Sequence, residues 1–235
     1  MTFIYHEANI LSRRNHHITY KWRPLFFVGR LLLFPFIWEE FRMNEKAGLR
    51  KEWMAKEAAL PRNYMEASNN GIVRNLFSLP EFQRAENILF FYSIWHEPDT
   101  HEMMRRALEQ KKTVALPRTY PKGVMTARRI KNLEELSPSK FGIPEPLESA
   151  MVLEPEELDL IVVPAIAFDR EGYRLGHGAG YYDIYLPKTK AFTCGITRER
   201  MMVSHVPREA HDVRINCIVT EDNVLRFCGN DDSST

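Results

Sequence analysis

The sequence has little cysteine, almost no net charge and no apolar run long enough for a membrane-spanning helix. Its three cysteines, Cys194, Cys217 and Cys228, form no CxxC pair. A disulfide framework or a cysteine zinc site is therefore not expected, and a reducing cytoplasm fits best. The formal net charge is +1, so no basic field points to nucleic acid. The 235 residues, 44% of them hydrophobic, suit one α/β domain plus an extra segment.

The longest apolar run lies near the N-terminus, at residues 24–38 (PLFFVGRLLLFPFIW). It contains Arg30 and Pro35 and is shorter than the roughly 20 residues that a bilayer-spanning helix needs. Basic residues precede the run, but no small-x-small cleavage site follows it. Three interpretations of residues 1–43 stay open: a targeting or membrane-associating extension, a helix packed on the domain, or an upstream start with true initiation at Met43. The third is favoured, because a recognisable domain begins directly after Met43.

Helical composition marks the next segment. Lys, Glu, Ala, Met and Leu are frequent over residues 44–69, and Pro61 divides this segment into two helical pieces. A further helix is expected over residues 70–79. Asp99 is a typical N-cap residue for another helix that reaches Gln110.

Short apolar runs alternate with these helices. Such runs are typical of strands that are buried on both faces of a parallel sheet. The expected strands are residues 87–94, 112–117, 124–130, 159–164, 191–196 and 215–220, the last of which closes the sheet. The proline-rich residues 131–156 are expected to hold at most a short helix, and the tail, residues 226–235, to be disordered. The pattern predicts an α/β fold with a mostly parallel sheet covered on both faces.

The most informative motif is a glycine run, RLGHGAGYYD at residues 174–183. Glycine at alternate positions lets backbone N–H groups converge on an anion, and a helix expected from Tyr181 adds its positive N-terminal end. The run follows the strand at residues 159–164 at the edge where open α/β sheets place ligands. Asp183 is placed to hold a divalent cation, and Arg174 adds a permanent positive charge. A flexible turn stays open as the alternative on this motif alone.

The longer segment PAIAFDREGYRLGHGAGYYDIYL resembles the signature of the 5-formyltetrahydrofolate cyclo-ligase family. Other segments of this chain resemble further elements of the family in the order that it requires. These segments are KAGLRKE (46–52), FYSIWHEPDT (91–100), TVALPR (113–118), FGIPEP (141–146) and HDVRINCIVTED (211–222). The resemblance covers about residues 44–225, which we take as the domain. Only the N-terminal extension and the tail lie outside it.

This resemblance implies an ATP-dependent ring closure with Mg²⁺ as cofactor. 5-Formyltetrahydrofolate would be converted to 5,10-methenyltetrahydrofolate, with ADP and phosphate released, through a phosphorylated formyl intermediate. The fold implied is a three-layer α/β/α sandwich of the kind shared with sugar-phosphate isomerases and CoA-transferases. No side-chain nucleophile is required, because positioning and charge neutralisation carry such reactions. We expect a cytoplasmic monomer whose partners are these small-molecule substrates.

The resemblance also implies roles for individual residues. Lys46, Arg50 and Arg174 would neutralise phosphate charge. The residues in contact with ATP would be Lys46, Arg50, Arg174, Leu175, Gly176, His177, Gly178, Ala179, Gly180, Tyr181 and Tyr182. The folate site would comprise Tyr92, Trp95, Glu97 and Phe141, with Glu97 accepting hydrogen bonds from pterin N–H groups. Asp183 would hold Mg²⁺, with Asn216 as a weaker partner.

Two positions depart from the family pattern. Ala179 stands where some members have a basic residue or glycine, which removes a possible side-chain contact with phosphate. Asn216 stands where aspartate is usual, and its neutral oxygen predicts weaker metal binding. These departures motivate an alternative, a catalytically weakened paralogue that binds folate or nucleotide. A zinc site at His96 and His101 is not expected, because five residues and a proline separate the two histidines.

Overall fold

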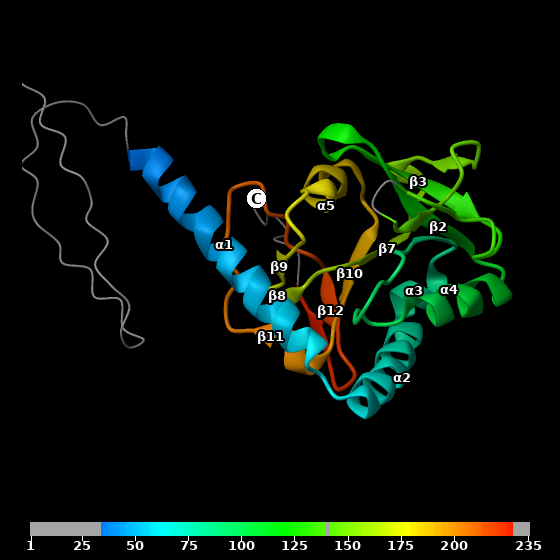
Figure 1. Ribbon diagram of the computed structural model, residues 1–235. Coiled ribbons are helices and arrows are strands. Elements are labelled where there is room, and N and C mark those ends of the chain that lie inside the picture. Colours follow the sequence, from blue (N-terminus) through cyan, green and yellow to red (C-terminus); the bar gives the residue numbers. More distant parts are fainter. Residues whose placement is uncertain (1–33, 140–141, 228–235) are drawn as a thin grey trace, which may run out of the picture.

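An eight-stranded mixed sheet forms the centre of the protein in the computed structural model, which describes residues 34–139 and 142–227 (Figure 1). Across the sheet the strand order is β13-β12-β10-β7-β1-β2-β3-β6. The strands are β1 (Asn87–Leu89), β2 (Thr113–Thr119), β3 (Met125–Ile130), β6 (Val152–Leu153), β7 (Leu160–Val163), β10 (Phe192–Ile196), β12 (Cys217–Val219) and β13 (Val224–Arg226). Neighbouring strands from β12 to β2 are parallel, whereas β13, β3 and β6 pair antiparallel at the two edges. The prediction of a mostly parallel sheet is confirmed.

The two faces of the sheet are covered by different elements. The α-helices are α1 (Phe34–Ala58), α2 (Arg62–Ser78), α3 (Pro80–Arg84), α4 (Thr100–Glu109) and α5 (Tyr181–Tyr185). Successive side chains of a strand point to opposite faces. In β1, Ile88 accordingly packs in the cluster that α2, α3 and α4 share, and Leu89 packs in the cluster that contains Tyr185 of α5. Helices therefore lie on both faces of the sheet, as the three-layer prediction requires (Figure 1).

A second, three-stranded sheet carries the glycine run. Its order is β11-β8-β9, and its strands are β8 (Ala167–Asp169), β9 (Arg174–Leu175) and β11 (Met202–Val203). Leu49 and Trp53 of α1 pack against an apolar cluster that includes Ile166 and Leu175. Because β9 ends at Leu175, the glycine run emerges where α1 lies against this sheet (Figure 1).

The helices differ from the predictions at three points. α1 begins at Phe34 rather than near residue 44, so no helix boundary marks Met43. The break at Pro61 is confirmed, because α1 ends at Ala58 and α2 begins at Arg62. The separate helix over residues 70–79 is wrong, because α2 continues without a break to Ser78. Nothing in that sequence interrupts the helix, and Ile72, Val73 and Leu76 of α2 are buried in the core cluster.

Several short elements were not predicted. The segment 131–156 holds strands β4 (Ser137–Pro138) and β5 (Pro144–Glu145), strand β6 and the start of a 3-10 helix, η2 (Pro155–Glu157). β12 does not close the sheet, because β13 pairs with it at the edge. The disordered tail was therefore placed too early: Arg226 is in β13, and the N–H of Phe227 donates to the Asn216 carbonyl. Residues 228–235 lie outside the described residues.

The interpretations of residues 1–33 likewise fall outside the described residues. Among residues 34–139 and 142–227, no helix has both the length and the apolar character that crossing a membrane requires. Whether the extension associates with a membrane stays a prediction.

A close contact at Gly71 gives a stability prediction. A methyl group at Gly71 would lie 2.7 Å from Cβ and 2.9 Å from Cα of Glu221, so α2 would have to move away from the loop that contains Glu221. Alanine gains about 1 kcal/mol of helix propensity over glycine, but overpacking costs about 1–3 kcal/mol. We therefore expect Gly71→Ala to lower the free energy of unfolding measured in urea.

Gly48→Ala is the matched control for this prediction. Gly48 lies inside α1, and a methyl group there would meet nothing within 4 Å. Only the helix propensity then acts, so Gly48→Ala is expected to raise the free energy of unfolding by up to about 1 kcal/mol. Equal effects of the two substitutions would contradict the importance of the Gly71 contact.

Candidate active site

The glycine run forms an open loop between β9 and α5. Gly178 and Gly180 have φ angles of 101° and 71°, values that side chains with a Cβ rarely adopt. Gly180 is the N-cap residue of α5. A methyl group at Gly176 or Gly180 would meet no other atom of the protein within 4 Å, so the space beside the backbone is open. The loop therefore has the shape of an anion cradle.

The two predicted cations of α1 have different contacts. Arg50 donates from Nε to the Gly176 carbonyl at 2.8 Å, and its guanidinium carbon lies 3.4 Å from the position of a methyl group on Gly178. Lys46 is buried and forms ion pairs with Glu209 at 3.0 Å and Asp212 at 2.8 Å. The structure thus brings Arg50 to the glycine run as predicted. In this structure Lys46 is neutralised by two carboxylates.

Arg174 supplies the third cation. Its side chain is buried, its Nη1 donates to the Val213 carbonyl at 3.0 Å and its Nη2 forms an ion pair with Asp183. Burial lowers the pKa of Arg174, whereas the charges of Asp183 and Asp212 raise it. Asp212 therefore lies within electrostatic range of Arg174 and contacts Lys46 directly. Arg50 thus contacts the glycine run, and Arg174 and Lys46 share Asp212 as a nearby carboxylate.

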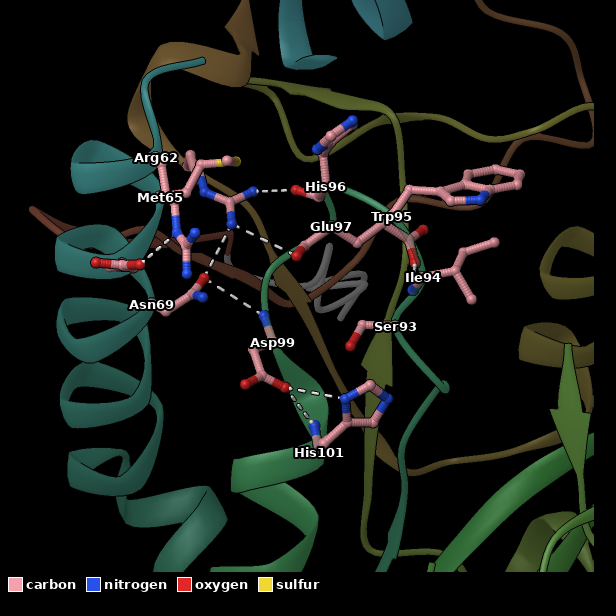
Figure 2. A pocket seen from close by; sticks show the side chains of 12 residues that line it. Arg62, Met65, Asn69, Ser93, Ile94, Trp95, His96, Glu97, Asp99 and His101 are labelled. Carbon is pink, nitrogen blue, oxygen red and sulfur yellow. Dashed lines mark hydrogen bonds and ion pairs between the residues drawn. The ribbon is translucent and has the colours of Figure 1, made fainter. Parts of the chain in front are cut away.

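Glu97 lines a separate cavity of about 300 Å³ (Figure 2). Residues of α2, of the loop after β1 and of the loop after β10 form its walls. The lining residues are Arg62, Met65, Glu66, Asn69, Ser93, Ile94, Trp95, His96, Glu97, Asp99, His101 and Arg198. The cavity is at the carboxyl end of the parallel strand β1, which is the edge that ligands occupy in α/β sheets.

The environment of Glu97 disfavours its charged form. Burial, with the charge of the neighbouring Glu57 as a smaller cause, raises the pKa of Glu97 to about 7. The hydrogen bond from the Ile94 N–H at 2.8 Å and the charge of Arg198 act in the opposite direction. A carboxyl group that titrates near neutral pH in a cavity is a typical feature of a functional site.

The other predicted folate residues have different environments. Trp95 is 79% exposed and points away from the protein interior (Figure 2). Tyr92 is half-buried, and its ring lies 4.3 Å from the ring of His101, which lines the cavity. Trp95 and Tyr92 therefore lie at or near the cavity that Glu97 lines. Phe141 lies outside the described residues.

Tyr182 lies in the first turn of α5, shortly after the glycines of the run. Its hydroxyl is buried and has no hydrogen-bond partner among the described residues. Burial raises the pKa of Tyr182 above its usual range, and both Arg174 and Glu97 lie near enough to affect it. A buried hydroxyl without a partner is costly unless a ligand or water completes its bonding. Tyr181 differs, since its hydroxyl donates to the Tyr120 carbonyl at 3.1 Å.

The two predicted metal ligands are not equivalent. Asp183 is in the first turn of α5 beside the glycine run, and carboxylate oxygens are suitable ligands for Mg²⁺. Asn216 lies next to the start of β12, where its Oδ1 accepts hydrogen bonds from the backbone N–H and the hydroxyl of Thr193, both at 2.8 Å. Asp183 offers one carboxylate to a cation, and in this structure that carboxylate is paired with Arg174. A metal contact by Asn216 requires both of its bonds to Thr193 to open.

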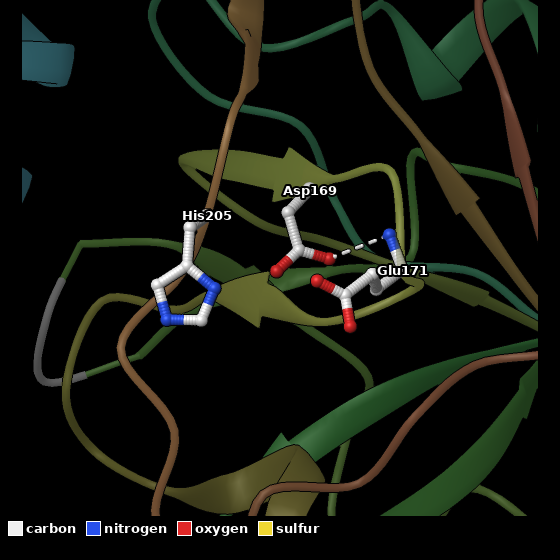
Figure 3. A group of neighbouring side chains, drawn as sticks. All are labelled: Asp169, Glu171 and His205. Atoms are coloured by element: carbon white, nitrogen blue, oxygen red, sulfur yellow. Dashed lines mark hydrogen bonds between the residues drawn. The ribbon is translucent and has the colours of Figure 1, made fainter.

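A second group of possible metal ligands has a structural explanation. The ligand atoms of Asp169, Glu171 and His205 lie within 4.8 Å of one another (Figure 3). Both oxygens of the buried Asp169 are already engaged, however. Oδ1 accepts from the N–H groups of Glu171 and Tyr173, and Oδ2 accepts from Val206 N–H and Arg208. Asp169 therefore fixes the turn between β8 and β9.

Sequence reasoning missed three residues of this region. Arg198 lines the Glu97 cavity, although the run TRERMM that contains it carries no motif. Asp212 and Glu209 hold Lys46. Asp212 lies within the closing segment that resembles the family, so that segment was the available signal.

Comparisons with known proteins identify the family of this chain. A sequence profile of the 5-formyltetrahydrofolate cyclo-ligase family matches residues 42–221. The 5-formyltetrahydrofolate cyclo-ligase of Haemophilus influenzae is 30% identical over 176 residues, which cover 72% of this chain and 94% of that protein. The probable 5-formyltetrahydrofolate cyclo-ligase of Schizosaccharomyces pombe is 28% identical over 179 residues, or 69% and 88% of the two chains.

A solved structure shows the same similarity. The NMR structure of Aquifex aeolicus 5,10-methenyltetrahydrofolate synthetase superimposes with a TM-score of 0.70 at 31% sequence identity. The superposition covers 80% of this chain and 99% of that protein. The similarity therefore extends over the whole of the solved relative.

Proposed function

The chain belongs to the 5-formyltetrahydrofolate cyclo-ligase family, and from this premise we propose that it closes 5-formyltetrahydrofolate to 5,10-methenyltetrahydrofolate at the expense of ATP. The observation that carries the proposal is the combination of a basic glycine loop and a cavity lined by a carboxyl group. Arg50 and Arg174 flank an open glycine loop, Glu97 lines a cavity, and Tyr182 is within electrostatic range of both.

The proposed reaction has two chemical steps. The formyl oxygen on N5 attacks the γ-phosphorus of ATP, the bond from that phosphorus to the bridging oxygen breaks, and ADP leaves. N10 then attacks the formyl carbon and loses its proton, and the carbon–oxygen bond breaks to release phosphate. The formyl oxygen thus leaves as part of the phosphate, and the C–N bond closes the ring.

The protein contributes charge and position to these steps. In the proposal, Lys46, Arg50 and Arg174 neutralise the phosphates of ATP, and the backbone from Gly176 to Gly180 cradles them. Because Lys46 and Arg174 are paired with carboxylates in this structure, ATP would compete with those carboxylates for the cations.

Glu97, in its ionised form, accepts hydrogen bonds from pterin N–H groups in the cavity. The Tyr182 hydroxyl gains a partner when substrate lies between the two sites. Asp183 would hold Mg²⁺, which supplies additional charge neutralisation for the phosphates when bound.

An absorbance assay tests the proposal directly. The full chain is incubated with 5-formyltetrahydrofolate, and formation of 5,10-methenyltetrahydrofolate is followed with and without MgATP. Product that forms only with MgATP is the expected result. Equal product without ATP would contradict the ligase chemistry. No product from folded protein that still binds 5-formyltetrahydrofolate in calorimetry would support the weakened paralogue instead, and Asn216→Asp would then be the first reversion to measure.

A further inference from the structure

Arg198 is the most completely buried charged side chain near the Glu97 cavity. It is 1% exposed and lies between β10 and the 3-10 helix η4 (Glu199–Met201). A guanidinium group has five N–H donors in a rigid plane, and burying it without partners would be very costly. Its hydrogen-bond partners therefore show which parts of the fold Arg198 holds together.

The donors of Arg198 join two elements. On one side, Nε donates to Ser68 Oγ and Nη2 donates to Asn69 Oδ1, both at 2.9 Å, and both partners are in α2. On the other side, Nη1 donates to the His96 carbonyl at 2.5 Å and Nη2 lies 3.4 Å from the Glu97 carbonyl. The guanidinium therefore bonds both to α2 and to the loop after β1. Arg198 thus ties the backbone of that loop to a helix.

The loop that Arg198 holds has an unfavourable backbone conformation. Trp95 has a φ angle of 51°, which a bulky residue without special support rarely adopts. The turn is closed by a hydrogen bond from the Glu97 N–H to the Ile94 carbonyl at 3.1 Å. The Glu97 carboxylate accepts the Ile94 N–H in return. The direction of the Glu97 side chain therefore depends on a strained turn.

We propose that Arg198 is a positioning residue for Glu97: by holding the carbonyls of His96 and Glu97 against α2, it keeps the Trp95 turn in the conformation that directs the Glu97 carboxylate to the cavity. This inference rests on the proposed function, because it takes the cavity as the folate site. It adds a residue that acts on substrate binding through the backbone and has no role in phosphate chemistry.

The charges around Arg198 fit this role. The carboxylate of Glu57 in α1 lies 3.8 Å from Nη1. Tyr64 of α2, Glu221 beyond β12 and Glu97 itself also lie within electrostatic range. The charge of Glu57 raises the pKa of Glu97, and the charge of Arg198 lowers it. Removal of Arg198 would therefore change both the geometry and the ionisation of Glu97.

The test replaces Arg198 by methionine and by lysine in the full chain. For Arg198→Met we expect the KM for 5-formyltetrahydrofolate to rise about 10- to 100-fold, the range that hydrogen bonds to a charged group account for. The KM for ATP should change less than about twofold, since Arg198 contacts no residue of the glycine run. Arg198→Lys keeps the charge but cannot hold both carbonyls and α2, so it should not restore the KM for the folate substrate.

A second readout separates positioning from a merely structural role. The pH at which folate binding is half-maximal should move upwards in Arg198→Met, because Glu97 loses a neighbouring cation that lowers its pKa.

Arg128→Met is the matched control. Arg128 is also buried and also holds a loop through two carbonyls, those of Glu148 and Ala150. We expect it to lower the melting temperature without raising the KM for folate.

The outcomes distinguish this inference from the proposed function. If the wild-type protein binds no 5-formyltetrahydrofolate in calorimetry, the proposed function fails. If the wild type binds it and Arg198→Met shows the same KM with only a lower kcat, the positioning role is overturned. Should Arg198→Met not fold, Ser68→Ala removes only the Nε partner and must still raise the KM for folate severalfold. An unchanged KM in Ser68→Ala would likewise overturn the inference.

Discussion

Replacing Arg174 by methionine is expected to lower kcat for methenyltetrahydrofolate formation about 100- to 1,000-fold, the loss that follows removal of one donor from a charge-stabilising site. Arg174 is 7% exposed and is held between the Val213 carbonyl and the Asp183 carboxylate. Methionine fills much of the same volume, so the loss should come from charge. The measurement is steady-state kinetics with ATP and folate varied separately.

The control for Arg174 lies on the same hairpin. Arg170 is exposed and forms an ion pair with Glu199 at 2.7 Å, and such surface pairs contribute little. Arg170→Met should therefore leave kcat within about twofold of the wild type. Arg174→Lys should fall between the two, because lysine keeps the charge but cannot bond Val213 and Asp183 in one plane. Full activity of Arg174→Met would contradict a role of this residue in phosphate binding.

Much of the sheet could be predicted because its central strands are apolar without interruption. LIVV of β7 is buried at every position, so burial and sequence pattern coincide there. β13 was missed because it consists of half-buried and exposed residues. Its strand conformation depends on its pairing with β12, which the local sequence does not show. For the same reason Arg226, which pairs with Glu81 of α3, was assigned to a disordered tail.

The candidate site was predictable where function depends on backbone conformation. Gly178 and Gly180 have positive φ angles, and only glycine adopts these readily, so the requirement is visible in the sequence. The partners of Lys46 were not predictable in this way. Glu209 and Asp212 are more than 160 residues away along the chain, at separations of 163 and 166, and no local pattern encodes such a pairing. Arg198 was missed because arginine is normally exposed.

Glu97→Gln is expected to raise the KM for 5-formyltetrahydrofolate about 100-fold, because a neutral amide cannot offer the pterin N–H groups two carboxylate oxygens. Its pH dependence should be equally distinctive. The pKa of Glu97 is raised to about 7, so in the wild type the carboxyl is mostly protonated below that pH. If binding needs the carboxylate, the KM should fall about tenfold for each unit of rising pH up to about 7 and then level off. In Glu97→Gln this dependence should disappear.

The stability of the protein should fall with rising pH over the range in which its affinity for 5-formyltetrahydrofolate rises. Burial raises the pKa of Glu97 from its ordinary value of 4.5 to about 7, so the folded protein binds a proton between these values that the unfolded chain releases. The contribution of Glu97 to stability is therefore lost as pH rises through this range. In thermal unfolding without ligand, Glu97→Gln should weaken the decline of the melting temperature over that range.

Two other side chains of the cavity supply the control. His96 and His101 line the same space as Glu97. If His96→Gln or His101→Gln removed the pH dependence of the KM for folate, the titrating group would be that histidine and the role of Glu97 would be contradicted. We expect both variants to keep it, because Glu97 is the group of this cavity whose pKa burial raises to about 7.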